Sequence, residues 1–203
     1  MDTANPTLKT IERLLAFDRS VRRFHANKEI TEETLLQLVN LTRFCASSQN
    51  MQPLRYVLIT TQTEKDALFP HLLWARHLKD WEGPSPHERP AAYLVQLTDT
   101  DIAPSLLCDC GLELQAITLG AAALGINCCI IRNFNPREVH QTLHLADNYK
   151  VEYVLALGYA SERVILEELK PGQDYGYYRL PDSTHVVPKR PLSERIVNIE
   201  LRK

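Results

Sequence analysis

Short runs rich in β-branched and aromatic residues alternate along this chain with longer segments of helical periodicity. Runs of the first kind are typical of buried strands. In the segments between them, apolar residues recur every three or four positions, as they do in helices that pack by one face. The alternation therefore predicts interleaved helices and strands. The expected strands are residues 55–61, 91–98, 127–131 and 151–157.

Capping residues mark the ends of the expected helices. Thr31 is a good N-cap, because two glutamates follow it in the positively polarised first turn. We expect Thr63 to cap another helix, which Pro70 kinks or divides. A long helix is expected to end at Gly125, a residue type favoured just after helix ends. The helices are expected to begin near residues 7, 31, 63, 104 and 136.

The chain has 203 residues, which is enough to bury a core without disulfides, and its charges nearly balance. With 23 Lys plus Arg against 25 Asp plus Glu, it lacks the basic field that sequence-independent nucleic-acid binding requires. Five cysteines, mostly within apolar runs, indicate buried free thiols in a reducing compartment. We expect a single domain over residues 1–203, with an irregular tail from about residue 160.

No segment predicts export or membrane insertion. The N-terminal stretch MDTANPTLKT has no apolar signal core. The most apolar tract, residues 116–131, is interrupted by Thr118 and Asn127 and is shorter than the roughly 18 residues that a membrane span needs. We therefore expect a cytoplasmic protein that binds neither membranes nor nucleic acid.

Three arginines and a serine lie close together in the stretch DRSVRRF, residues 18–24. A second basic pair, Lys189 and Arg190, stands between two prolines; alone, such a pair is usually a solvated loop end. Together the two segments predict a site for a small phosphate-bearing ligand, because a phosphate dianion needs several Arg or Lys donors. Ser20 can add a hydroxyl. The chain has neither a GxGxxG motif nor a Gly-rich loop ending in Gly-Lys to serve instead.

Four stretches, in this order and spacing, resemble the flavin-dependent nitroreductase family. They are DRSVRRF, ASSQNMQP, GLELQAITLGAAALGINCCII and VPKRPLSERI. The stretch LLWARHLKDWEGPSPHERPAAYLVQL is also similar to the middle of the compact members of that family. The resemblance covers about residues 10–197, and the set of four stretches carries it rather than any single motif.

The resemblance implies an α+β fold, a three-layer α/β/α sandwich with a central mixed, mainly antiparallel sheet. It implies a homodimer with one FMN in each of two clefts between the subunits. The implied function is an FMN-dependent oxidoreductase that passes electrons from NADH or NADPH to a small acceptor such as a nitroaromatic or a quinone. The alternative is an FMN-binding dimer without meaningful turnover, which acts as a flavin carrier or sensor.

The resemblance also assigns residues to FMN. Arg19 and Ser20 match positions that hold the phosphate and ribityl chain, while Lys189 and Arg190 match a basic tail that closes on the phosphate. Arg22 matches a basic position near the flavin pyrimidine edge. A cation there stabilises the negative charge that reduction places on the flavin.

Two further segments complete the implied site. Ser47, Ser48 and Asn50 match a loop that reaches the flavin from the partner subunit, although ASSQNMQP read by itself is equally a polar turn after a helix. The segment whose backbone lies over the flavin ring and bonds its N5 is matched by Ile131, Arg132 and Asn133. Since the flavin carries the chemistry, no catalytic side chain is assigned.

At three positions within or beside these segments, the chain departs from the family pattern. Asp18 stands where Arg is common, and its carboxylate is expected to weaken phosphate binding. Arg132 and Asn133 stand where Gly is frequent and are expected to narrow or charge the substrate cleft. No metal site is predicted, because HQTLH has the histidine spacing of a zinc helix but carries Gln141 in place of the glutamate base.

Overall fold

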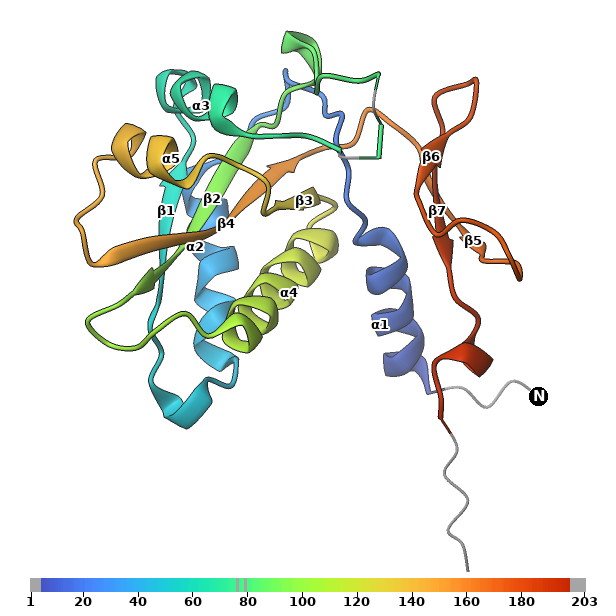
Figure 1. Cartoon of the computed structure of the whole chain (residues 1–203), viewed down its shortest axis with the longest axis horizontal. Coiled ribbons are helices and arrows are strands. Elements are labelled where there is room, and N and C mark those ends of the chain that lie inside the picture. Colours follow the sequence, from blue (N-terminus) through green and yellow to red (C-terminus); the bar gives the residue numbers. More distant parts are fainter. Residues whose placement is uncertain (1–4, 76, 79, 198–203) are drawn as a thin grey trace, which may run out of the picture.

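The computed structural model describes residues 5–75, 77–78 and 80–197, and a four-stranded sheet lies at its centre (Figure 1). The strand order is β1-β2-β4-β3, and every adjacent pair runs antiparallel. All four predicted strands are thereby confirmed. They are β1 (Leu54–Ile59), β2 (Ala92–Asp99), β3 (Asn127–Ile131) and β4 (Tyr149–Gly158).

Helices cover both faces of this sheet, so the protein has the expected three-layer α+β arrangement. One face packs against α2 (Glu32–Asn40) and α4 (Leu107–Ala123). The other packs against α3 (Gln62–Leu68) and α5 (Pro136–Thr142). Helix α1 (Pro6–Phe17) lies beside α4 in Figure 1 and has no buried residue.

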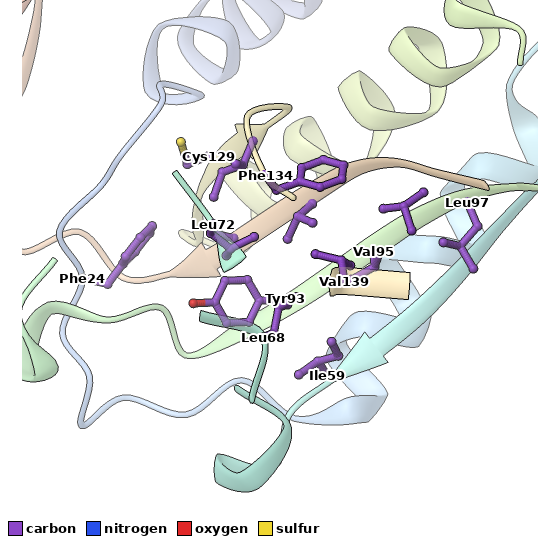
Figure 2. Close-up of a cluster of buried hydrophobic side chains, with 14 of the residues drawn as sticks. Phe24, Ile59, Leu68, Leu72, Tyr93, Val95, Leu97, Cys129, Phe134 and Val139 are labelled. Atoms are coloured by element: carbon purple, nitrogen blue, oxygen red, sulfur yellow. The ribbon is translucent and has the colours of Figure 1, made fainter. Parts of the chain in front are cut away.

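Strand β2 is buried at all eight positions, because the sheet is covered on both faces. Successive side chains of a strand point to opposite faces. Tyr93 and Val95 therefore join the cluster between the sheet and helices α3 and α5 (Figure 2). Leu94 lies in the cluster on the α2 and α4 side.

Local capping chemistry sets the helix starts. The Thr31 side chain accepts a hydrogen bond from the backbone of Thr34, which confirms its predicted role at α2. The predicted cap of α3 is wrong: Thr61 is the N-cap rather than Thr63, because Glu64 completes a capping box with Thr61. Gly125 ends α4 at a φ of 73°, a conformation that favours glycine.

The segment after residue 160 is not an irregular tail. It forms a second sheet in the order β5-β7-β6, in which β5 and β7 are parallel and β6 is antiparallel. Figure 1 shows this sheet on the side of α1, away from α3 and α5. Its strands are too short to give a clear sequence pattern. They are β5 (Val164–Glu168), β6 (Tyr178–Arg179) and β7 (His185–Lys189).

The other expectations from composition are met in part. No helix in the described ranges is long and apolar enough to cross a membrane. The cysteines are free, and Cys110, Cys128 and Cys129 are buried as expected. Cys108 is exposed, which corrects the expectation for that residue, because it lies on the outer side of the first turn of α4.

Candidate functional site

Two adjoining cavities lie where the arginine stretch, strand β3 and the C-terminal sheet meet. Their volumes are about 550 and about 350 Å³. Arg22 and Ile130 line both cavities, so the two adjoin at these side chains. Each volume lies within the range of small-molecule sites. We call them the larger and the smaller cavity.

The arginine stretch reaches the cavities because it pairs with the free edge of β3. Ser20 forms an isolated parallel bridge with Cys128, and the backbone N–H of Val21 donates to the Cys128 carbonyl at 3.0 Å. The four strands of the central sheet all pair antiparallel, so this parallel bridge makes the sheet mixed, as expected. The bridge fixes Arg19 and Arg22 on either side of Ser20 at the cavity wall.

The smaller cavity collects four of the predicted phosphate-binding residues: Arg19, Ser20, Arg22 and Lys189. The Nε atom of Arg19 is buried and has no hydrogen-bond partner among the described residues. Burial, followed by the positive charges of Arg19 and Arg195, lowers the pKa of Lys189. Cations that repel one another around a cavity fit an anionic ligand, whose charge would relieve the repulsion.

Asp18 also lines the smaller cavity, but it does not pair with the neighbouring arginines. Its Oδ2 atom accepts hydrogen bonds from Nε2 of Gln115 and Oγ1 of Thr118, each at 2.7 Å. Both donors belong to α4, so Asp18 ties the end of α1 to that helix. Because both donors are neutral, the negative charge of Asp18 stays at the cavity.

The larger cavity contains the predicted segment Ile131, Arg132 and Asn133, which ends and follows β3. The facing wall is the stretch 73–75, which includes Trp74. The two walls are joined by a hydrogen bond from the backbone N–H of Leu73 to the Asn133 carbonyl at 2.9 Å. Most residues that line the larger cavity are apolar, and the guanidinium groups of Arg22 and Arg132 are also in its lining.

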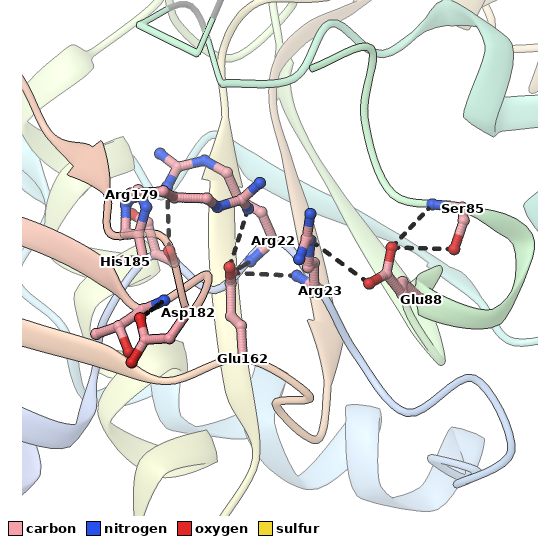
Figure 3. A network of polar contacts seen from close by, with 10 residues as sticks. Arg22, Arg23, Ser85, Glu88, Glu162, Arg179, Asp182 and His185 are labelled. Carbon is pink, nitrogen blue, oxygen red and sulfur yellow. Dashed lines mark hydrogen bonds and ion pairs between the residues drawn. The ribbon is translucent and has the colours of Figure 1, made fainter. Parts of the chain in front are cut away.

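Arg22 is held from several directions at the junction of the two cavities (Figure 3). Its Nη1 atom lies 3.2 Å from the carbonyl oxygen of Ser20 and 3.2 Å from Nε2 of His185. Its guanidinium lies 4.6 Å from the centre of the Tyr177 ring. Its backbone N–H donates to Glu162 at 2.6 Å.

Glu162 is the acidic centre of this cluster. One of its oxygens accepts from the backbone N–H groups of Arg22 and Arg23, and the other accepts from the Arg179 guanidinium at 3.0 Å. The Arg179 guanidinium also lies 4.4 Å from the centre of the Trp81 ring. Glu162 thus joins the arginine stretch to β6 of the C-terminal sheet.

His185 belongs to the smaller cavity and was missed from the sequence. It is 1% exposed. Burial, followed by the charges of Arg22 and Arg179, lowers its pKa to about 4. The two-residue period of β7 places His185 on the same face as Val187 and Lys189, and all three line the smaller cavity. HVVPK has no regular alternation of polar and apolar residues, so the sequence carried no clear signal for His185.

Arg190 does not line the smaller cavity with the residues it was predicted to join. It lines a third cavity with Tyr175 and Arg195, and Lys189 borders both that cavity and the smaller one. Its guanidinium forms an exposed ion pair with Glu194 at 2.8 Å. In this structure, therefore, only one member of the Lys189 and Arg190 pair reaches the smaller cavity.

The loop with Ser47, Ser48 and Asn50 lines neither cavity of its own chain. It is nonetheless held firmly. Asp109, 2% exposed, accepts from Oγ of Ser47 at 2.7 Å and from the backbone N–H of Ser48 at 3.0 Å. The loop also contains three non-glycine residues with positive φ: Gln49, Asn50 and Gln52. Such conformations persist only where surrounding contacts enforce them, and they cluster at functional sites.

Comparison with known proteins identifies the family to which this chain belongs. The Nitroreductase family model matches residues 15–159, most of the chain. The protein therefore belongs to the nitroreductase family. A comparison with curated proteins found no match.

Solved structures of low sequence identity share this fold. A nitroreductase family protein from Streptococcus pneumoniae TIGR4 has a TM-score of 0.65 at 16% identity, over 93% of this chain and 100% of that one. An NADPH:FMN oxidoreductase from Vibrio harveyi, complexed with NAD+, has a TM-score of 0.62 at 20% identity, over 96% and 78%. An FMN-dependent nitroreductase from Clostridium difficile R20291 has a TM-score of 0.61 at 18% identity, over 75% and 88%.

Proposed function

We propose that this protein is an FMN-dependent oxidoreductase that passes electrons from NADH or NADPH to a small acceptor such as a nitroaromatic or a quinone. The observation that carries this proposal is the convergence of Arg19, Ser20 and Lys189 on a cavity that adjoins a second one, whose lining includes Trp74 and Ile131. Membership of the nitroreductase family supports a redox role. The names of two structural relatives support FMN and NAD(P)H as the reactants.

The residues present fit FMN, which has a phosphate at one end and a flat aromatic ring at the other. The smaller cavity supplies the unpaired Nε of Arg19, the Ser20 hydroxyl and the Lys189 ammonium, which are the donors that a phosphate needs. The larger cavity supplies apolar walls from Trp74 and Ile131 for a ring system. The two ends of the ligand thus match the two ends of the site.

The side chains of the two cavities would bind and orient FMN and shield it from water, and would not themselves react. Bound FMN supplies the hydride acceptance from the nicotinamide and the electron transfer to the acceptor. Arg22, at the junction of the cavities, keeps a fixed positive charge where negative charge develops on reduction. The half-buried Trp74 would shield the ring from water on the wall opposite β3.

The proposal includes a homodimer. Ser47, Ser48 and Asn50 stand away from the cavities of their own chain, so a second chain is needed to bring this loop to a flavin. Helix α1 exposes apolar side chains that an isolated monomer would leave in water. They are Leu8, Ile11, Leu15 and Phe17. We also propose a cytoplasmic location, which the free thiols support.

The test measures bound flavin first and turnover second. Purified protein, or FMN-free protein mixed with FMN, should release about one FMN per chain on denaturation, since each chain contributes one pair of cavities. Anaerobic NADH or NADPH should then bleach the flavin, and an added nitroaromatic or quinone should restore its colour. Absence of flavin, together with an unchanged melting temperature on adding FMN, contradicts the proposal.

The same experiment separates the alternative function. A protein that binds FMN at full stoichiometry but is bleached by neither NADH nor NADPH is a flavin carrier or sensor without meaningful turnover. Oxidation of NAD(P)H at a rate that depends on the acceptor supports the enzyme instead. Parallel lines in double-reciprocal plots are expected, because both reactants use the flavin in turn.

A further inference from the structure

His185 has no role in the function proposed so far, yet it lies at the centre of the site. It is 1% exposed and belongs to the lining of the smaller cavity. Its backbone is fixed in β7, where it pairs with Val164 of β5 and Arg179 of β6. Its ring contacts the Tyr177 ring, with the ring centres 5.0 Å apart. A side chain held this firmly can in turn hold a neighbour.

The hydrogen bond between His185 and Arg22 determines the tautomer of the imidazole. A guanidinium group donates hydrogen bonds but cannot accept them. Since Nη1 of Arg22 lies 3.2 Å from Nε2 of His185, Nε2 must be the acceptor and carry no proton. A neutral imidazole then carries its proton on Nδ1.

The groups around His185 keep it neutral. Guanidinium groups from Arg22 and Arg179 face it, and burial adds to their effect in lowering its pKa to about 4. Glu162 is the acid of this cluster, but its oxygens already accept from the arginine stretch and from Arg179. The Tyr177 ring contacts the His185 ring at a tilt and lies beneath the Arg22 guanidinium. The ring therefore remains an acceptor at neutral pH.

The arrangement is not one that maximises stability. Nδ1 of His185 is buried without a hydrogen-bond partner among the described residues, and the tautomer deduced above makes it an unsatisfied donor. A buried donor without an acceptor is destabilising, whereas an apolar group of the same shape is close to neutral. Burial for packing alone would favour an apolar ring at this position. Because the unsatisfied Nδ1 donor lowers stability, the presence of histidine at this position points instead to a role in the site.

We propose that His185 is a positioning residue that holds the Arg22 guanidinium at the junction of the two cavities by accepting its N–H at a neutral Nε2. It does not touch a reacting atom; it acts through Arg22. The C-terminal sheet thereby contributes to the cofactor site through β7. This inference rests on the proposed function, because the effect on FMN assumes that FMN binds there.

The first experiment tests the tautomer in FMN-free protein and is independent of the proposed function. Nitrogen and carbon NMR of protein with labelled histidine should show His185 as a neutral ring protonated at Nδ1, at every pH from about 6 to 8. A ring protonated at Nε2, or a charged ring over that range, would overturn the inference. The signal is assigned by its loss in His185→Phe.

The second experiment measures FMN affinity in matched variants. His185→Phe keeps the ring shape but removes the acceptor, and should weaken FMN binding about tenfold. His185→Gln restores an acceptor oxygen and should stay within about threefold of the parent. His140→Phe makes the same chemical change on α5, outside both cavities, and should leave FMN affinity unchanged.

The outcomes distinguish the two proposals. If the parent binds FMN and His185→Phe binds it equally well, the positioning role is wrong while the proposed function stands. If His185→Phe and His185→Gln weaken binding equally, the acceptor is not what matters, and the inference fails again. If the parent does not bind FMN at all, the proposed function fails, and the NMR result in FMN-free protein still decides whether His185 accepts from Arg22.

Discussion

At the scale of single residues, the basic segments divide their cations between different tasks. In DRSVRRF, Arg19 and Arg22 line the cavities, whereas Arg23 forms an ion pair with Glu88 at 3.4 Å. In the C-terminal segment, Lys189 lines the smaller cavity and Arg190 does not. Equal charge in the sequence therefore does not mean equal contribution to the site.

This division predicts different effects of removing two arginines. Arg19→Ala should weaken FMN binding by about tenfold or more, because it removes a partly buried donor with a free Nε. Arg190→Ala should weaken it by less than about threefold, because Arg190 is exposed and already paired with Glu194. Titrations by flavin fluorescence at two salt concentrations measure both. An equally large loss for Arg190→Ala would mean that the tail rearranges when FMN binds.

Asp18 should oppose phosphate binding. Its carboxylate lines the smaller cavity and is bonded by neutral donors, so its charge is not cancelled by an arginine. Asp18→Asn should therefore tighten FMN binding by about threefold at low salt and by less at high salt, since screening weakens the repulsion. The same titration measures this variant. Weaker binding by Asp18→Asn would show that its bonds to α4 matter more than its charge.

At the scale of elements, the loop over residues 47–52 depends on α4. Asp109 holds it with hydrogen bonds from Ser47 and Ser48, and the backbone N–H of Gln52 donates to Oγ of Ser47 at 2.9 Å. These contacts offset the unfavourable positive φ angles within the loop. A polar loop held so tightly, and outside both cavities of its own chain, is what a partner-borne site segment requires.

Asp109→Asn should loosen this loop. The change removes charge-assisted hydrogen bonds at a buried position and should lower the free energy of unfolding by about 1–3 kcal/mol. FMN affinity should also fall if the loop serves a partner's flavin, although Asp109 lines neither cavity. Denaturant unfolding measures the first effect and flavin titration the second. Asp101→Asn, at an exposed turn, is the matched control, and a similar loss there would contradict the explanation.

At the scale of the whole molecule, contacts among Arg22, Glu162 and His185 join the arginine stretch to the C-terminal sheet (Figure 3). Ser20 in turn joins that stretch to β3 of the central sheet. The site is therefore not carried by one loop. Its parts come from the arginine stretch, the end of β3 and strand β7. Unfolding of the C-terminal sheet would remove one wall of the smaller cavity, so the stability of the fold and the site are coupled.

The pKa of His185 predicts one component of stability against pH. Its pKa in the folded protein is about 4, below the ordinary value of 6.5, so the unfolded chain binds a proton more readily. This component is fully present above pH 6.5 and is lost as pH falls from 6.5 towards 4, with a slope of at most about 1.4 kcal/mol per pH unit. Denaturant unfolding across that range measures it. His185→Phe should lose less stability over the same range, and identical pH dependence would contradict the assignment.

The oligomeric state is the second prediction at this scale. Light scattering should give twice the chain mass of 23.2 kDa, because the apolar side of α1 is exposed in one chain. Ile11→Glu should shift the population towards monomer and weaken FMN binding. Arg13→Glu, on another side of the same exposed helix, should do neither. A parent monomer with full FMN stoichiometry would rule out the shared site.

The sequence by itself determined the elements of the main sheet and the two segments that supply the cations. Hydrophobic periodicity and caps such as Thr31 act locally, so they can be read without knowing the fold. Arg19, Ser20, Arg22 and Lys189 were selected as candidates because a phosphate ligand needs donors of that kind. Thr63 was chosen wrongly as a cap, although the spacing of Thr61 and Glu64 is the sequence pattern of the capping box that the structure contains.

Only the tertiary structure decided which of these residues meet. The pairing of Ser20 with the edge of β3 is a contact between distant segments, and no local pattern encodes it. The same holds for the second sheet, whose short strands gain their order from one another rather than from their own periodicity. His185, Val187 and Lys189 face the smaller cavity together because they alternate along β7, whereas Arg190 follows the end of that strand and does not line that cavity. Local chemistry thus supplied the candidate residues, and long-range backbone pairing selected among them.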